Sequence, residues 1–85
     1  MVIYYSSKFK KEYKHLSFFV KKLAEKKELL FRDNPHNLAL KSHQLTGRLK
    51  SYWSFSISYQ YRIIFEFVRD GEVWFHSVGT HEIYK

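Results

Sequence analysis

The C-terminal part of the chain alternates between apolar and polar residues, and this pattern limits the possible folds more than any other feature of the sequence. From Tyr52 onward the hydrophobic period is two, which is typical of β-strands. The dipeptide Asp70-Gly71 interrupts the pattern and strongly favours a two-residue hairpin turn of type I′. We therefore predict three consecutive antiparallel strands, the first beginning at Tyr52 and the others spanning residues 61–68 and 72–81.

A two-residue turn at this position fixes which residues face each other across the hairpin. Arg62 then lies opposite Gly79, and by the same count Phe65 lies opposite His76. Side chains alternate between the two faces of a sheet. One face is largely apolar and should pack against the rest of the domain; it holds Tyr61, Ile63, Phe65, Phe67, Trp74, His76, Val78 and Thr80. The other face is mixed and holds the ionisable residues Arg62, Glu66 and His81.

The mixed face is the first place to look for function. Arg62 and His81 are expected to be diagonal neighbours there, roughly 7–8 Å apart at the backbone. An odd-numbered loop, such as residues 58–60, would place Ser56 opposite Arg62 and keep the preceding strand in phase. Gly79 leaves the surface beside Arg62 free of bulk. We therefore predict a polar concavity around these four residues.

Other residues of the sheet have simpler expected roles. Trp53, Phe55, Phe65 and Trp74 are predicted to be core residues. His76 falls on the apolar face and is predicted to be an interior or edge histidine. Glu66 follows Arg62 by four residues and lies on the same mixed face, and we interpret it as a structural ion-pair partner of Arg62.

The N-terminal half has the period of α-helices. Ser6 or Ser7 can cap a short amphipathic helix over residues 8–16, and Ser17 can cap a second helix. The second helix should end at Asn34-Pro35, because proline disfavours helical geometry in the residue before it. Its buried side is predicted to hold Phe19, Val20, Leu23, Ala24, Leu30 and Phe31, and a Glu28–Arg32 pair should support it.

The remaining segments complete an α+β domain. Residues 2–5 are predicted to be one strand, and residues 34–51 a connector with a short strand around 39–45 and a turn at Gly47. We expect two N-terminal helices, forming an antiparallel hairpin, packed on one face of a twisted antiparallel sheet of about four strands. The 85 residues suit a single domain spanning positions 1–85.

The net charge of +7 is unevenly distributed. Residues 1–50 carry ten lysines and two arginines against four acids, whereas residues 51–85 have a net charge of −1. Lysine and arginine displace counterions from phosphates, so this half is suited to bind a polyanion such as a nucleic acid. A solvated, lysine-rich helix surface or an acidic protein partner would fit the same charges.

The absence of cysteine excludes disulfides, thiol catalysis and cysteine-based zinc sites. It also favours the reducing cytosol, because small extracellular domains often depend on disulfides. The N-terminus has no apolar segment typical of a secretory signal, and the longest apolar runs are too short to cross a bilayer. We therefore expect a cytoplasmic protein with no membrane partner.

Three short motifs in the second half of the chain resemble the RelE/ParE superfamily of bacterial toxins. They are the block L-T-G-R-L-K-S-Y at residues 45–52, the strand Y-R-I-I-F at 61–65 and the tail G-T-H at 79–81. Their order and spacing are most similar to the YafQ/RelE branch, the ribosome-dependent mRNA interferases. The resemblance extends over nearly the whole chain, including the two lysine-rich helices.

This resemblance implies a function and its partners. The chain would be the toxin of a type II toxin–antitoxin system in the bacterial cytoplasm, cutting mRNA in the A site of the 70S ribosome. Cleavage would proceed by attack of the ribose 2′-OH on the adjacent phosphate, with no metal and no cofactor. A cognate antitoxin, using an acidic segment that wraps the basic surface, would neutralise it.

The resemblance also assigns candidate site residues. His43 and His81 match catalytic histidines, Arg62 matches the arginine of the central strand, and Tyr84 lies where several members place a catalytic aromatic residue. The RNA-contacting set would be Lys41, Arg48, Lys50 and Ser56. The chain departs from some YafQ-like members, which have a histidine at Ser56 and an acid at Gln60.

Two other functions are compatible with the same fold. One is a ParE-like inhibitor of DNA gyrase, which binds without catalysis, although the G-T-H tail argues against it. The other is a catalytically inactive relative that acts as a binding protein, which the missing histidine at Ser56 suggests.

Overall fold

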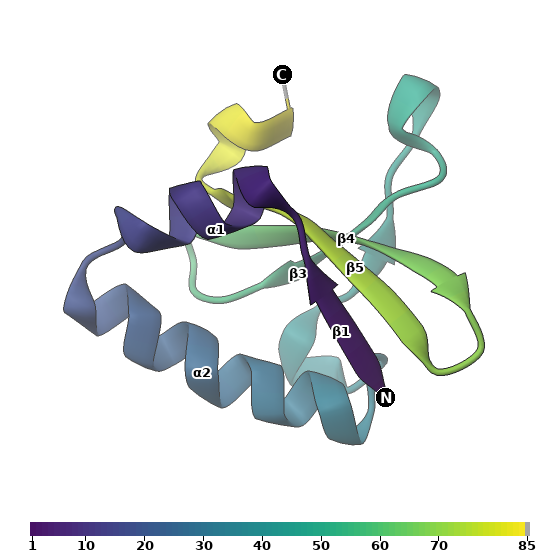
Figure 1. The fold of residues 1–85 in the computed structure, drawn as a ribbon, viewed down its shortest axis with the longest axis horizontal. Coiled ribbons are helices and arrows are strands. Elements are labelled where there is room, and N and C mark those ends of the chain that lie inside the picture. Colours follow the sequence, from purple (N-terminus) through teal and green to yellow (C-terminus); the bar gives the residue numbers. More distant parts are fainter. Residues whose placement is uncertain (85) are drawn as a thin grey trace.

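Two helices pack against a five-stranded sheet in the computed structural model, which describes residues 1–84 (Figure 1). The strands are ordered β1-β5-β4-β3-β2 across the sheet. Their bounds are β1 (Val2–Tyr5), β2 (His43–Gln44), β3 (Trp53–Ser56), β4 (Arg62–Arg69) and β5 (Glu72–Gly79). The helices are α1 (Ser7–Lys14) and α2 (Phe18–Asp33), and short 3-10 turns cover Leu38–Leu40, Gly47–Leu49 and His81–Tyr84.

The predicted α+β class is confirmed, with two corrections to the sheet. It has five strands rather than four, and β1 pairs with β5 in parallel, so the sheet is mixed. Alternation identifies a four-residue strand but contains no information about which neighbour it joins or in which direction. The described residues contain no helix long and apolar enough to cross a membrane.

The helix ends follow the predicted capping residues. The hydroxyl of Ser6 accepts a hydrogen bond from the backbone N–H of Phe9, and that of Ser17 accepts one from Val20. Each satisfies a backbone donor that the first helical turn leaves without an intrahelical partner. Asn34 ends α2 in an extended conformation directly before the proline, as predicted.

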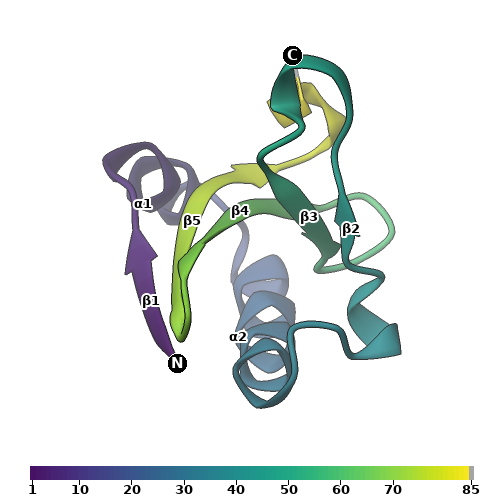
Figure 2. The same cartoon turned by 90° about the vertical axis from the view of Figure 1, so that its right-hand side faces the viewer.

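The helices α1 and α2 run in opposite directions, but they cover different parts of the sheet (Figures 1 and 2). β1 pairs only with the first half of β5, and α1 lies along the edge of the second half. There the hydroxyl of Ser6 donates to the carbonyl of His76, and the carboxylate of Glu12 accepts from the backbone N–H of Val78. The helix therefore satisfies backbone groups that an edge strand would otherwise leave unpaired.

Replacing Glu12 with glutamine should make folding stability less dependent on pH. Burial raises the pKa of this carboxyl, but hydrogen bonds from Lys8, Ser77 and the N–H of Val78 outweigh burial, so the net pKa lies below its ordinary value of 4.5. A carboxyl with a lowered pKa stabilises the fold above its unfolded-state pKa, and this contribution is lost as the pH falls through the folded-state value.

We expect Glu12→Gln to lower the free energy of unfolding by about 1–3 kcal/mol at neutral pH. The difference from the wild type should shrink as the pH falls below 4.5. Urea titrations at several pH values measure this, with Glu25→Gln as a control because Glu25 is exposed on α2. A difference that stays constant with pH would contradict the assignment.

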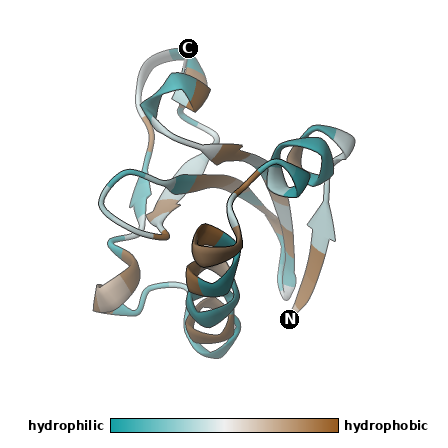
Figure 3. Ribbon diagram, turned by 90° about the vertical axis from the view of Figure 1, so that its left-hand side faces the viewer, coloured by the Kyte–Doolittle hydropathy of each residue, from teal (hydrophilic) through white to brown (hydrophobic). Residues whose placement is uncertain are grey.

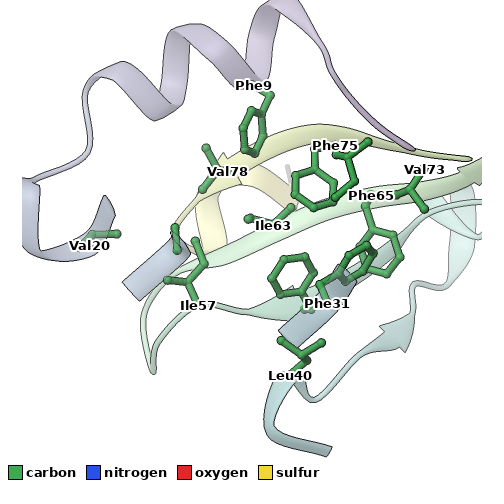
Figure 4. Packing of buried hydrophobic residues seen from close by; sticks show 13 residues of the cluster. Phe9, Val20, Phe31, Leu40, Ile57, Ile63, Phe65, Val73, Phe75 and Val78 are labelled. Carbon is green, nitrogen blue, oxygen red and sulfur yellow. The ribbon is translucent and has the colours of Figure 1, made fainter. Parts of the chain in front are cut away.

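α2 packs across the inner face of the sheet. Phe31 is fully buried, and its ring lies 5.0 Å from that of Phe55, 4.9 Å from Phe65 and 5.3 Å from Phe75 (Figure 4). The buried cluster also contains Ile3, Phe9, Val20, Ala24, Leu40, Ile57, Ile63, Val73 and Val78.

The predicted buried side of α2 was too wide. Phe19 is 71% exposed and Leu30 is 36% exposed, whereas Val20, Ala24 and Phe31 are buried. Only a narrow stripe of α2 faces the sheet. Because α1 covers a different part of the sheet, no second helix buries the other sides of α2. Figure 3 shows apolar colouring over much of α2, while α1 is mostly hydrophilic.

The hairpin forms with the predicted two-residue turn, since Arg69 pairs with Glu72. The predicted type I′ geometry is wrong: Gly71 has a positive φ of +75°, but Asp70 lacks the positive φ that this type also requires. Arg62 pairs with Gly79 as predicted. Phe65, however, pairs with Phe75 instead of His76. His76 is therefore an extra residue in β5, a β-bulge.

The bulge exchanges the two faces of β5 before His76. Val73 and Phe75 point into the core, while Trp74 is 37% exposed on the other side. The predictions that Trp74 belongs to the core and that His76 lies on the apolar face are therefore wrong. Phe55 and Phe65 are buried as predicted, and Trp53 is partly buried against the core.

Candidate active site

The face of the sheet opposite α2, called here the open face, contains a hollow of about 360 Å³. This site hollow is lined by His43, Leu45, Thr46, Leu49, Arg62, His81 and Tyr84. Figure 2 shows the C-terminal turn, His81–Tyr84, and the loop before β3 lying together on the side of the sheet opposite α2. All four predicted catalytic residues thus surround one hollow, although they come from three separate segments.

Arg62 is held by one of its nitrogens. Nη1 donates to the carbonyl of Ser58 at 2.7 Å and lies 3.3 Å from the carbonyls of Tyr59 and Tyr61. Among the described residues, Nε and Nη2 have no hydrogen-bond partner, so they remain able to donate to a ligand. The guanidinium does not pair with Glu66, and the predicted Arg62–Glu66 ion pair is wrong: Glu66 lies 3.0 Å from Nε2 of His76 instead.

His43 is oriented by the backbone beside it. Its Nδ1 lies 3.1 Å from the carbonyl oxygen of Lys41. A carbonyl can only accept, so the neutral imidazole carries its proton on Nδ1 and keeps a lone pair on Nε2. Lys41 has a positive φ of 53°, a left-handed conformation that is unfavourable for a side chain with a Cβ.

His81 reaches the site hollow by a route that differs from the prediction. β5 ends at Gly79, and His81 begins the C-terminal turn rather than continuing the strand. Tyr84 closes the same turn, and its hydroxyl forms a 2.8 Å hydrogen bond with the buried hydroxyl of Ser54. The ring centres of His81 and Tyr84 lie 6.2 Å apart.

Several solved structures are similar in fold to this chain. The crystal structure of YafQ from E. coli strain BL21(DE3) superposes with a TM-score of 0.75, at 22% identity over 96% of this chain and 94% of that one. The YoeB/ParE toxin from Agrobacterium tumefaciens gives 0.81 at 15% identity, covering 95% and 99%. The YoeB dimer from Staphylococcus aureus gives 0.71 at 26% identity, covering 95% and 97%.

The chain has the RelE/ParE toxin fold. Neither a family model nor a curated protein matches the sequence. The likeness therefore lies in the arrangement of the elements.

Within this RelE/ParE fold, the predicted RNA-contacting residues lie around the site hollow rather than in its lining. Arg48 and Lys50 are exposed, in and just after the turn whose neighbours Thr46 and Leu49 line the hollow. The side chain of Lys41 is exposed next to His43. Ser56 is half-buried opposite Arg62, as the predicted register requires. The described residues contain no group of three or more His, Asp and Glu side chains that could hold a metal ion.

Sequence reasoning missed Ile83, which fixes the C-terminal turn of this fold onto the sheet. The space left by the missing side chain of Gly79 is filled by Ile83, whose Cγ2 lies 2.6 Å from where a Cβ on residue 79 would be. Gly79 was predicted to keep the surface open, and the structure shows it filled. An apolar residue four positions after a strand-end glycine was the available signal.

Gly79→Ala is expected to displace the C-terminal turn and to lower stability by about 1–3 kcal/mol. Cγ2 is attached to a branched β-carbon whose χ1 rotamers are restricted, so it has few alternative positions to move to. Thermal unfolding and the NMR shifts of the His81–Tyr84 turn measure the effect. The double variant Gly79→Ala/Ile83→Ala removes the clash and should resemble Ile83→Ala alone; equal damage in the presence and absence of Ile83 would contradict this contact.

Proposed function

We propose that this chain is the toxin of a type II toxin–antitoxin pair and an endoribonuclease that cuts mRNA. The observation that carries the proposal is the gathering of two imidazoles and a partly free guanidinium around one open hollow, in a chain of net charge +7. The fold supports it, since YafQ and YoeB are solved toxins, and YafQ has been crystallised in a DinJ–YafQ toxin–antitoxin complex.

The reaction needs a base, an acid and positive charge. His43 is suited to be the base, because its Nε2 lone pair is available to take the proton of a ribose 2′-OH. The 2′-oxygen then attacks the adjacent phosphorus, and the bond to the 5′-oxygen breaks. His81, when protonated, can donate to that leaving oxygen, and the products are a 2′,3′-cyclic phosphate and a free 5′-OH.

Arg62 is suited to stabilise the charge that builds up on the phosphate. Nε and Nη2 point in a fixed fork because Nη1 is already bound to the β3–β4 loop. Preorganised charge of this kind is often the largest single contribution to catalysis. Two imidazoles also compensate for the departures at Ser56 and Gln60, since an acid and a base remain available.

Tyr84 fits a positioning role better than a chemical one. Its hydroxyl is bound to Ser54, which holds the C-terminal turn, and with it His81, over the sheet. Arg48, Lys50 and the Lys41 side chain would contact phosphates on either side of the scissile one, because they flank the hollow and are exposed.

The partners follow from the same proposal. The substrate would be mRNA in the A site of the 70S ribosome, in the bacterial cytoplasm. The antitoxin would use an acidic segment on the lysine-rich surface. It would also cover an exposed group of apolar side chains on and beside α2, because free monomers rarely expose such groups. They are Phe18 (75% exposed), Phe19 (71%), Leu29 (70%) and Leu38 (92%).

The test is expression of the wild-type chain without an antitoxin, followed by mapping of mRNA ends in translating extract. We expect arrested translation and new 3′ ends that carry a 2′,3′-cyclic phosphate. DNA damage with intact mRNA would instead identify a ParE-like gyrase inhibitor. If neither RNA nor DNA is altered, the chain is a non-catalytic binding protein and the proposal fails.

A further inference from the structure

Four ring side chains form a row across the open face, separate from the site hollow. Tyr4, on the outermost strand β1, stacks on Trp74 with ring centres 5.4 Å apart. Trp74 stacks on His76 at 6.0 Å, and His76 lies 5.0 Å from Tyr52. Tyr4 is 40% exposed and Trp74 is 37% exposed, so the end of this aromatic row at β1 is accessible.

The aromatic row exists because of the two features of the sheet that alternation did not predict. Trp74 and His76 are two residues apart and share a face of β5, and the bulge turns that face away from the core. The parallel pairing of β1 places Tyr4 beside Trp74. The row ends at β1, the edge strand of the sheet.

A second hollow links the aromatic row to the site hollow. It measures about 310 Å³, and its lining includes Lys8, Tyr52, His76 and Leu49. Leu49 also lines the site hollow, so the two depressions adjoin. On β4, Arg62 lines the site hollow and Glu66 contacts His76 of the aromatic row. The two residues are four positions apart, or roughly 13 Å along the strand. This is a distance of only a few nucleotides along a single strand.

We propose that the aromatic row is a stacking subsite for unpaired bases of an RNA strand whose scissile phosphate occupies the site hollow. This inference depends on the proposed function for the identity of the ligand. Every base has a π-face that can stack on an aromatic ring, so such a subsite favours single strands without selecting a sequence. The net charge of +7 suits the accompanying phosphates.

Polar groups at the row add contacts to base edges. The His76–Glu66 pair, 3.0 Å apart, lies within the row and offers both a donor and an acceptor. In a duplex the faces of each base are stacked on its neighbours and its pairing edge is bound to the partner base, so neither can contact the row. Duplex RNA of the same charge should therefore bind through its phosphates alone.

The experiment measures binding without cleavage. A fluorescently labelled 2′-O-methyl oligoadenylate lacks the attacking hydroxyl, and a matched abasic oligomer keeps the phosphates but lacks the bases. We expect Trp74→Ala to weaken binding of the oligoadenylate by roughly 5- to 150-fold and to leave binding of the abasic oligomer unchanged. Trp74→Phe should retain most of the affinity. The matched control is Phe18→Ala, an exposed aromatic residue on α2.

Several outcomes would overturn the proposal. Unchanged oligoadenylate binding by Trp74→Ala would do so, and so would equal wild-type affinity for the two oligomers. A wild-type dimer that Trp74→Ala dissociates in sedimentation would show that the row is a contact with a second copy of the chain. Base-dependent binding in a chain that cleaves no mRNA would leave the subsite intact and remove the proposed enzyme function. Cleavage of mRNA without base-dependent binding would leave the enzyme function intact and remove the stacking subsite.

Discussion

Replacing Arg62 and His81 together with alanine is expected to lower mRNA cleavage by at least about 1,000-fold and to abolish growth arrest. A positioned general acid contributes about 10²–10⁴-fold, and a preorganised charge contributes about 10²–10³-fold. The two act on the same phosphate, so their losses should not simply multiply. Cleavage is measured from mapped mRNA ends, and toxicity from growth after induction.

The structure offers a matched control for this double variant. Arg69 is on the same strand, with a side chain 72% exposed, and His15 is an exposed residue at the end of α1. Arg69→Ala/His15→Ala removes the same charges and ring types and should remain close to wild-type activity. Circular dichroism confirms that both variants are folded. If the Arg62/His81 variant cleaves mRNA as well as this control, the chemistry is not at the site hollow.

The sequence was sufficient wherever local geometry alone decides the structure. Ser6 and Ser17 begin helices because a side-chain oxygen can satisfy a free N–H within a single turn. Gly71 sets the hairpin turn because few residues other than glycine tolerate its positive φ. The register of β3 on β4 followed from the pleat, and Ser56 is opposite Arg62 as predicted.

The sequence was not sufficient where distant segments decide. The bulge at His76 leaves no pattern of its own, because one extra residue turns an alternating strand into another alternating strand of opposite phase. Its position is favoured by contacts outside the hairpin: Ser6 binds the carbonyl of His76, and Phe75 fits between Phe9 and Phe31. None of these partners is adjacent in sequence.

The candidate site combines both situations. Arg62 was placed on the correct face by alternation alone. His81 was expected on that face through strand alternation, yet it reaches the site hollow through a turn whose docking depends on Gly79 and Ile83. His43 could not be placed by periodicity, since only two residues of the connector form a strand. The resemblance to a known family named these residues, and the fold brings them together.

Phe31→Ala is expected to have the largest effect on stability of any single change in the chain. Phe31 is fully buried and is the one ring of α2 that contacts Phe55, Phe65 and Phe75, which belong to three different strands. Truncating a buried phenylalanine costs about 3–5 kcal/mol, because the neighbouring rings cannot collapse into the space. A domain of this size has only about 4–13 kcal/mol in total.

The variant should therefore be partly unfolded at growth temperature, and its melting temperature should fall by more than about 10 °C. Phe18→Ala removes the same ring from the same helix at a position that is 75% exposed, and should change stability by less than about 0.5 kcal/mol. Phe31→Leu, which keeps part of the volume, should lie between the two. Because α2 touches the site only through the sheet, activity per folded molecule should survive in Phe31→Leu. An equal loss of stability in Phe18→Ala and Phe31→Ala would mean that α2 does not pack on the sheet through Phe31.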